Sequence, residues 1–101
     1  MGAISQKGAE FLIRSRLADA EAGDVDALFE LGVTYSTGRG DIAVDLIEAH
    51  KWFNLAALSG CTRGQQCRAE SAAEMTAREI AEAQRQARAW LGSGSYGRRA
   101  A

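Results

Sequence analysis

Apolar positions along this chain recur at spacings of three and four residues, which is the period of an amphipathic α-helix. Glycines separate the periodic segments, and proline is absent. No segment shows the strict alternation that is typical of a half-buried strand. The pattern therefore predicts an all-α protein of about five helices. Their expected ranges are 5–22, 24–38, 45–60, 62–74 and 76–91.

Residues that commonly cap helices stand at the predicted starts. Asp24 and Asp45 precede apolar segments and are suited to accept hydrogen bonds from free backbone N–H groups of the first turn. Thr76 and Glu79 have the spacing of a capping box, in which each side chain bonds to the backbone of the other residue. Gly64 lies inside the predicted helix over 62–74, where glycine costs about 1 kcal/mol.

Composition indicates one globular domain. The chain has 101 residues, of which 47% are hydrophobic and 25% are charged, and this length suits a single hydrophobic core. We expect the domain to span 1–91. The remaining segment, 92–101, is rich in glycine and serine, so we expect a flexible tail there.

Charge and hydropathy narrow the range of partners. The formal net charge is -1, so the basic surplus that is typical of nucleic-acid-binding domains is missing. No apolar run approaches the roughly 20 residues that a membrane span needs, and the N-terminal segment lacks the layout of a secretory signal. We therefore expect no nucleic-acid partner, no membrane insertion and a cytoplasmic location.

Few residues suit catalysis or metal binding. His50 is the only histidine and stands close to Trp52 on an apolar segment, so we expect a partly buried structural side chain. Cys61 and Cys67 are too far apart along a helix to share one face, and the chain has no CxxC pair. We expect two free thiols in a reducing compartment and a non-enzymatic protein with no catalytic residue, cofactor or metal site.

Small and bulky residues alternate over 23–60 as a helical hairpin requires. Small residues let helices approach each other, leucine and aromatic side chains fill the space between them, and glycines let the chain reverse. This segment resembles a Sel1-like repeat of the tetratricopeptide-like superfamily. The resemblance rests on the residues that we expect to form the repeat core, namely Ala27, Leu31, Gly32, Tyr35, Gly38, Gly40, Ala49, Trp52, Ala56, Ala57 and Gly60.

The resemblance implies a short α-solenoid of antiparallel helical hairpins, with the flanking helices as caps. It weakens in two places. The loop over 41–44 is about one residue longer than in the family pattern. After Gly60, the last two helices resemble only a degenerate second hairpin, with Gly64 where alanine is expected.

The resemblance also implies an adaptor or scaffold that docks a partner peptide or helix on its repeat surface. The candidate contacts lie on the second helix, on the side that faces away from the repeat core. They are Asp26, Phe29, Glu30, Val33 and Ser36. Burial in the core is the alternative for Phe29. A self-assembling structural module is the alternative function, because Trp90 and Leu91 would form a homodimer patch if the core leaves them exposed.

Overall fold

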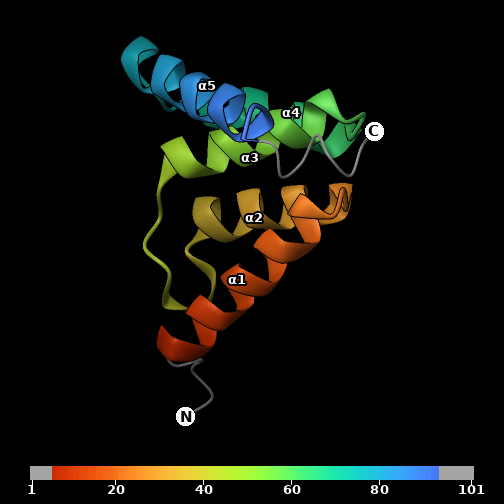
Figure 1. Cartoon of the computed structure of the whole chain (residues 1–101). Coiled ribbons are helices and arrows are strands. Elements are labelled where there is room, and N and C mark those ends of the chain that lie inside the picture. The colour runs from red at the N-terminus through yellow and green to blue at the C-terminus, as the bar shows by residue number, and fades with distance from the viewer. Residues whose placement is uncertain (1–5, 94–101) are drawn as a thin grey trace.

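The computed structural model describes residues 6–93 (Figure 1). Its elements are α1 (Gln6–Glu21), α2 (Val25–Thr37), the short 3₁₀ helix η1 (Arg39–Asp41), α3 (Leu46–Leu58), α4 (Thr62–Ala72) and α5 (Ala77–Leu91). The described range contains five α-helices and no strand, so the predicted all-α fold is confirmed. Of the predicted tail, 94–101 lies outside the described residues, and Gly92 and Ser93 form a turn after α5.

The predicted capping residues begin their helices. The Asp24 carboxylate accepts hydrogen bonds from two backbone N–H groups of the first turn of α2, at 3.0 and 3.3 Å. The Asp45 carboxylate accepts one in α3 at 3.1 Å. Thr76 and Glu79 form the capping box of α5, with hydrogen bonds of 2.9 and 3.1 Å. At the other ends, α3 and α4 each stop two residues earlier than predicted, where the chain turns into the next connection.

Helix α3 occupies the centre of the molecule. It forms an antiparallel hairpin with α2, while α1 packs obliquely on α2 and both α4 and α5 pack on α3 (Figure 1). The sequence predicts a second hairpin over the last two helices, but α4 and α5 make their main contacts with α3 rather than with each other. A broad apolar face lets α3 serve three neighbours. Its buried apolar residues are Ala49, Trp52, Phe53, Leu55, Ala56 and Ala57.

Two aromatic pairs connect the helices inside the core. Trp52 of α3 meets Trp90 of α5 edge-to-face, with ring centroids 5.4 Å apart, and Phe29 of α2 meets Phe53 of α3 at 5.6 Å. Such pairs add to the free energy gained from burying the rings. Seven residues of the predicted repeat core are buried, and Tyr35 is partly buried. The seven are Ala27, Leu31, Gly32, Ala49, Trp52, Ala56 and Ala57.

Two glycines allow helices to approach closely. A Cβ atom on Gly32 would lie 2.4 Å from Cδ1 of Phe53, so only glycine leaves space for this ring against α2. A Cβ atom on Gly64 would lie 3.0 Å from Cβ of Ala56 and 3.2 Å from the backbone nitrogen of Ala57, where α4 meets α3. Gly64 therefore disfavours the helix locally but permits its packing.

The loop between α2 and α3 folds back toward α1. Gly38 ends α2 with a φ of 73°, and Gly40 and Asp41 also have positive φ values, of 67° and 68°. Glycine adopts this left-handed conformation without strain, whereas few other residues do. The left-handed backbone at these three residues brings Ile42 beside α1, and a cavity lies where the two meet.

Candidate functional site

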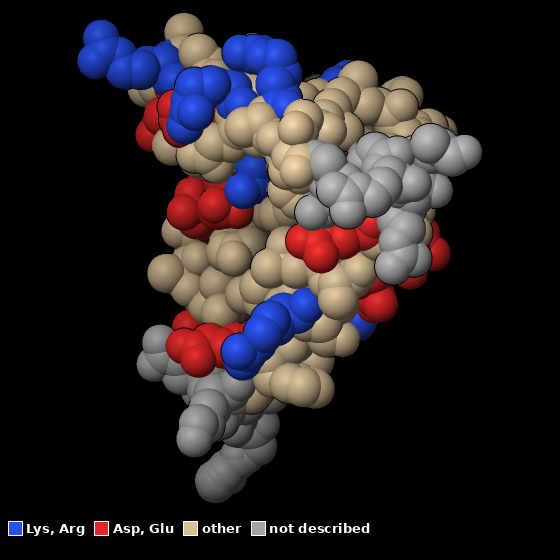
Figure 2. All heavy atoms as spheres, in the orientation of Figure 1, with Lys and Arg blue, Asp and Glu red and all other residues tan. Residues whose placement is uncertain are grey.

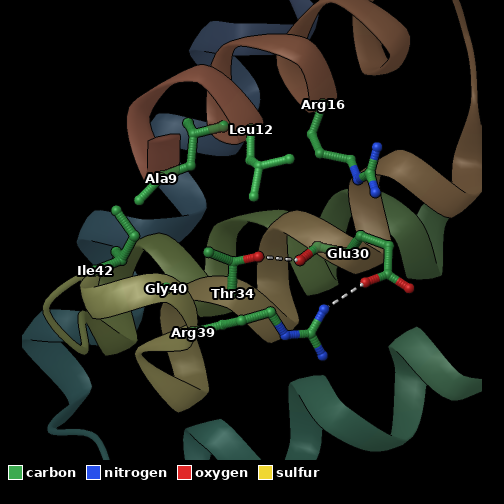
Figure 3. A pocket seen from close by; sticks show the side chains of 9 residues that line it. Ala9, Leu12, Arg16, Glu30, Thr34, Arg39, Gly40 and Ile42 are labelled. Carbon is green, nitrogen blue, oxygen red and sulfur yellow. Dashed lines mark hydrogen bonds and ion pairs between the residues drawn. The ribbon is translucent and has the colours of Figure 1, made fainter. Parts of the chain in front are cut away.

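A cavity lies between α1, α2 and the loop that follows α2 (Figure 3). Its volume is about 80 Å³. One water-sized group needs about 10–15 Å³ by the same measure, so the cavity has room for one aliphatic side chain. We call it the Leu12 cavity. Its lining residues are Ala9, Leu12, Ile13, Arg16, Glu30, Thr34, Arg39, Gly40 and Ile42.

The Leu12 cavity is apolar at one end and charged at the other. Leu12 of α1 and Ile42 of the loop approach it from opposite walls (Figure 3). At the charged end, the Arg39 guanidinium donates a hydrogen bond to Oε1 of Glu30 at 3.2 Å. The Thr34 hydroxyl donates to the backbone carbonyl of Glu30 at 2.9 Å. The exposed ion pair adds little stability, but it holds two charged side chains at the rim.

An acidic hollow adjoins the Leu12 cavity at the turn between α1 and α2. Arg16 and Glu30 line both spaces, so the two lie side by side. Three carboxylates complete the hollow, those of Asp19, Asp24 and Asp26. Asp24 is engaged as the cap of α2, whereas Asp19 and Asp26 are exposed. The Leu12 cavity and the acidic hollow together form the α1–α2 groove.

A more open hollow lies beside the Leu12 cavity, also between α1, α2 and the loop. Ile13 and Ile42 line this hollow as well as the Leu12 cavity, and Tyr35 forms part of its wall. Burial raises the pKa of the Tyr35 phenol, and the carboxylates of Glu48 and Asp45 raise it further. The phenol therefore stays neutral near pH 7, so the Tyr35 side chain adds no charge to this hollow.

Leu12 is the most accessible apolar residue of the Leu12 cavity. It lies at the edge of the α1 face that packs on α2, where Ala9 and Ala20 are buried, and 42% of its surface is exposed. The preceding residue, Phe11, is 65% exposed on the outer side of α1. Single exposed apolar residues are common on protein surfaces. Leu12 differs because it borders a cavity that another side chain could fill.

The structure separates the five residues that the sequence suggests for partner binding. Glu30 lines the Leu12 cavity, and Asp26 lines the acidic hollow. Val33 is partly buried against the core, and the Ser36 hydroxyl donates a hydrogen bond to its backbone carbonyl at 3.2 Å. The two acidic candidates therefore share one surface with the groove, and the other candidates do not line it.

Phe29, the fifth candidate, belongs to the core. It is only 6% exposed, its ring packs on Phe53, and the Arg63 guanidinium lies over it at 4.4 Å from the ring centroid.

Sequence reasoning overlooks Arg39 and Ile42, which do line the groove. Their loop departs in length from the repeat pattern, and that departure is the one available signal.

His50 links α3 to α4 in the interior. Its Nδ1 lies 3.0 Å from the Ser71 hydroxyl, which itself donates a hydrogen bond to the Arg68 carbonyl at 3.0 Å. Ser71 has one hydroxyl proton, so its oxygen accepts from Nδ1–H of a neutral imidazole. Burial lowers the pKa of His50, and the Arg68 guanidinium lowers it further, while a hydrogen bond to the Arg68 backbone opposes them.

Both cysteines are free thiols, and each is partly buried. Cys61 caps α4, because its Sγ accepts a hydrogen bond from the Gly64 N–H at 3.3 Å. Burial raises the pKa of Cys67, and the nearby Glu70 carboxylate adds to the shift, so little reactive thiolate forms near neutral pH. Within residues 6–93, no group of three or more His, Cys, Asp or Glu side chains could hold a metal ion.

The end of α5 is divided between core and surface. Trp90 is partly buried and packs edge-to-face on Trp52, so the core covers part of this residue. Leu91 is exposed. One exposed leucine is a small area compared with the several hundred Å² of a typical apolar interaction patch.

Comparisons with known proteins return no match, whether with family models, with curated proteins or with solved structures. None of the helices in the described part of the chain is long and apolar enough to cross a membrane. The resemblance to a Sel1-like repeat and the docking role therefore stay predictions.

Proposed function

We propose that this chain is a non-enzymatic protein-interaction module that docks a short peptide segment of a partner in the α1–α2 groove. The Leu12 cavity carries the proposal, because it has room for one side chain, is apolar at one end and is lined by charged residues at the other. An apolar pocket that takes an anchor side chain supplies most of the binding energy in many interfaces, and a polar rim orients the partner.

The walls of the groove are held by the core, which favours binding without rearrangement. Ala9 and Ala20 of α1 are buried, so the helix is fixed near both of its ends. The loop is tied to α2, because the Asp45 N–H donates a hydrogen bond to the Tyr35 carbonyl at 2.9 Å. A preformed site loses less conformational entropy when a partner binds.

We also propose that 23–60 is a Sel1-like repeat. Three of its small residues have the physical roles that the repeat pattern assigns to them. Gly32 accommodates the Phe53 ring, Gly38 reverses the chain in the left-handed conformation, and Ala56 is buried where α4 meets α3. Close helix packing and a tight reversal are the properties that stacked helical repeats need.

A direct test uses N-acetylleucine amide as a probe of the Leu12 cavity. At about 0.3 kcal/mol for each of its roughly twelve heavy atoms, the probe should bind with a Kd of the order of millimolar. Two-dimensional ¹H–¹⁵N NMR spectra of the full chain should then show saturable shifts for backbone amides near Leu12, Thr34 and Ile42. Shifts spread evenly over the chain, or confined to another surface, would contradict the proposal.

Two variants distinguish binding in the cavity from nonspecific apolar contact. Leu12→Asp places a charge at the rim and should abolish the shifts. Leu58→Asp is the matched control, because Leu58 is 64% exposed at the end of α3 and does not line the groove. Leu58→Asp should unfold thermally close to the wild type, because Leu58 is largely exposed. Leu12→Asp should lose some stability but stay folded, because Leu12 lies at the edge of the packed face with 42% of its surface exposed.

Self-assembly remains a second candidate, because Phe11 and Leu12 are consecutive exposed apolar residues on α1. Sedimentation equilibrium of the same NMR samples decides between the two. A constant monomer mass over a wide concentration range would argue against self-assembly. A mass that rises with concentration in the wild type and in Leu58→Asp, but not in Leu12→Asp, would favour a homodimer over a docked partner peptide.

A further inference from the structure

The α1–α2 groove has a direction, because its apolar end and its acidic end differ in what they can bind. We propose that the docked partner segment combines an apolar anchor side chain with a lysine or arginine that reaches the acidic hollow. This inference rests on the proposed function and specifies the chemistry of its partner. The apolar cavity provides the site, and the charges next to it decide which segment fits.

The balance of charge in the acidic hollow is negative. Glu30 is already paired with Arg39 at 3.2 Å. Arg16 then stands as one guanidinium beside three carboxylates, those of Asp19, Asp24 and Asp26. Hydrogen bonding of Asp24 to the start of α2 stabilises its negative charge rather than removing it. A basic side chain entering the hollow therefore meets a net attraction.

An acidic partner segment would meet a net repulsion in the acidic hollow. It would gain one interaction with Arg16 and be repelled by the surrounding carboxylates. On the face shown in Figure 2, most basic side chains lie over α5, and one lies over α1. Complementary charge of this kind mainly sets specificity and association rate, because exposed pairs are screened by salt.

The spacing between the two ends sets the spacing in the partner. Thr34 lines the Leu12 cavity and Asp26 lines the acidic hollow, and both stand on α2. Their eight-residue separation in the sequence corresponds to about 12 Å along the helix axis. An extended peptide advances about 3.3 Å for each residue. The basic residue should therefore lie about four positions from the apolar anchor.

The test is a selection of random displayed peptides on the immobilised full chain. Four baits are compared: the wild type, Leu12→Asp, the double variant Asp19→Asn with Asp26→Asn, and Leu58→Asp. Asp24 is left intact because its carboxylate caps α2, and replacing it would perturb the helix itself. Thermal unfolding checks that every bait is folded.

The expected result is a common pattern on the wild type and on Leu58→Asp, with an apolar residue and a lysine or arginine about four positions apart. Leu12→Asp should enrich no such peptides. The double variant should retain the apolar preference and lose the basic one. Synthetic copies of the selected peptides should bind the double variant about three- to tenfold more weakly than the wild type, with a smaller difference at high salt.

Other results separate the two proposals. Peptides that require Leu12 but carry acidic residues, or no charge preference, would refute the basic partner and leave the docking function in place. Enrichment that is the same on Leu12→Asp, or no enrichment on any bait, would overturn both. An affinity that is unchanged in the double variant would also refute the inferred chemistry, even if the selected peptides are basic.

Discussion

Gly32 offers a sharp test of the packing between α2 and α3. A Cβ atom at this position would lie 2.4 and 2.5 Å from two atoms of the Phe53 ring, well inside the optimum of about 3.5–4.0 Å between carbon atoms. The ring has little freedom to move, because Phe53 is buried and also packs on Phe29. Gly32→Ala should therefore destabilise the protein, although alanine is the better helix former.

The expected magnitude is a difference between two opposing effects. Overpacking a filled core costs about 1–3 kcal/mol, and these contacts are short enough to place the cost in the upper part of that range. Replacing glycine by alanine inside a helix returns about 1 kcal/mol. The net loss in the free energy of unfolding should be about 1–2 kcal/mol, or a decrease in Tm of roughly 5–10 °C for a domain of this size.

The assay is urea unfolding followed by circular dichroism, in the wild-type and Phe53→Leu backgrounds. Leucine has no Cε atom and can turn its Cδ atoms away, so Gly32→Ala should become neutral or stabilising by up to about 1 kcal/mol there. A coupling energy of about 1–3 kcal/mol is expected. If Gly32→Ala stabilises the wild-type protein by about 1 kcal/mol, the ring does not lie against α2 and the packing described here is wrong.

Two further predictions concern the centre of the molecule. Trp52→Ala removes a buried ring that packs on Trp90 and whose Nε1–H donates a hydrogen bond to Glu48 at 3.0 Å. Urea unfolding should show a loss of about 3–5 kcal/mol in the free energy of unfolding. A loss below about 1 kcal/mol would contradict the place of Trp52 in the core. The lowered pKa of His50 predicts lower stability in mild acid, because the unfolded chain then binds the proton more readily than the folded one. The loss should begin as the pH falls below about 6.5, and His50→Gln should flatten the dependence between about pH 7 and pH 5 if neutral glutamine keeps the bond to Ser71.

Local signals in the sequence determined where most helices begin. Asp24, Asp45 and the Thr76 capping box act on backbone groups within three residues of themselves, so their effect needs no tertiary context. The apolar period likewise indicated a buried face on the second and third helices, but it placed Phe29 outside the core, where the structure buries it. The structure places α2, α4 and α5 around the broad apolar face of α3.

Tertiary structure decided where the groove lies and which residues line it. The oblique packing of α1 on α2 leaves Leu12 at an edge rather than in the core, and the backbone turns after Gly38 bring Ile42 to the opposite wall. Phe29 shows the same dependence, because Arg63 and Phe53 cover it from helices far along the chain. Helical periodicity specifies the faces of single helices, but a cavity between helices depends on their crossing angles, which follow from the shapes of all the side chains at the contact.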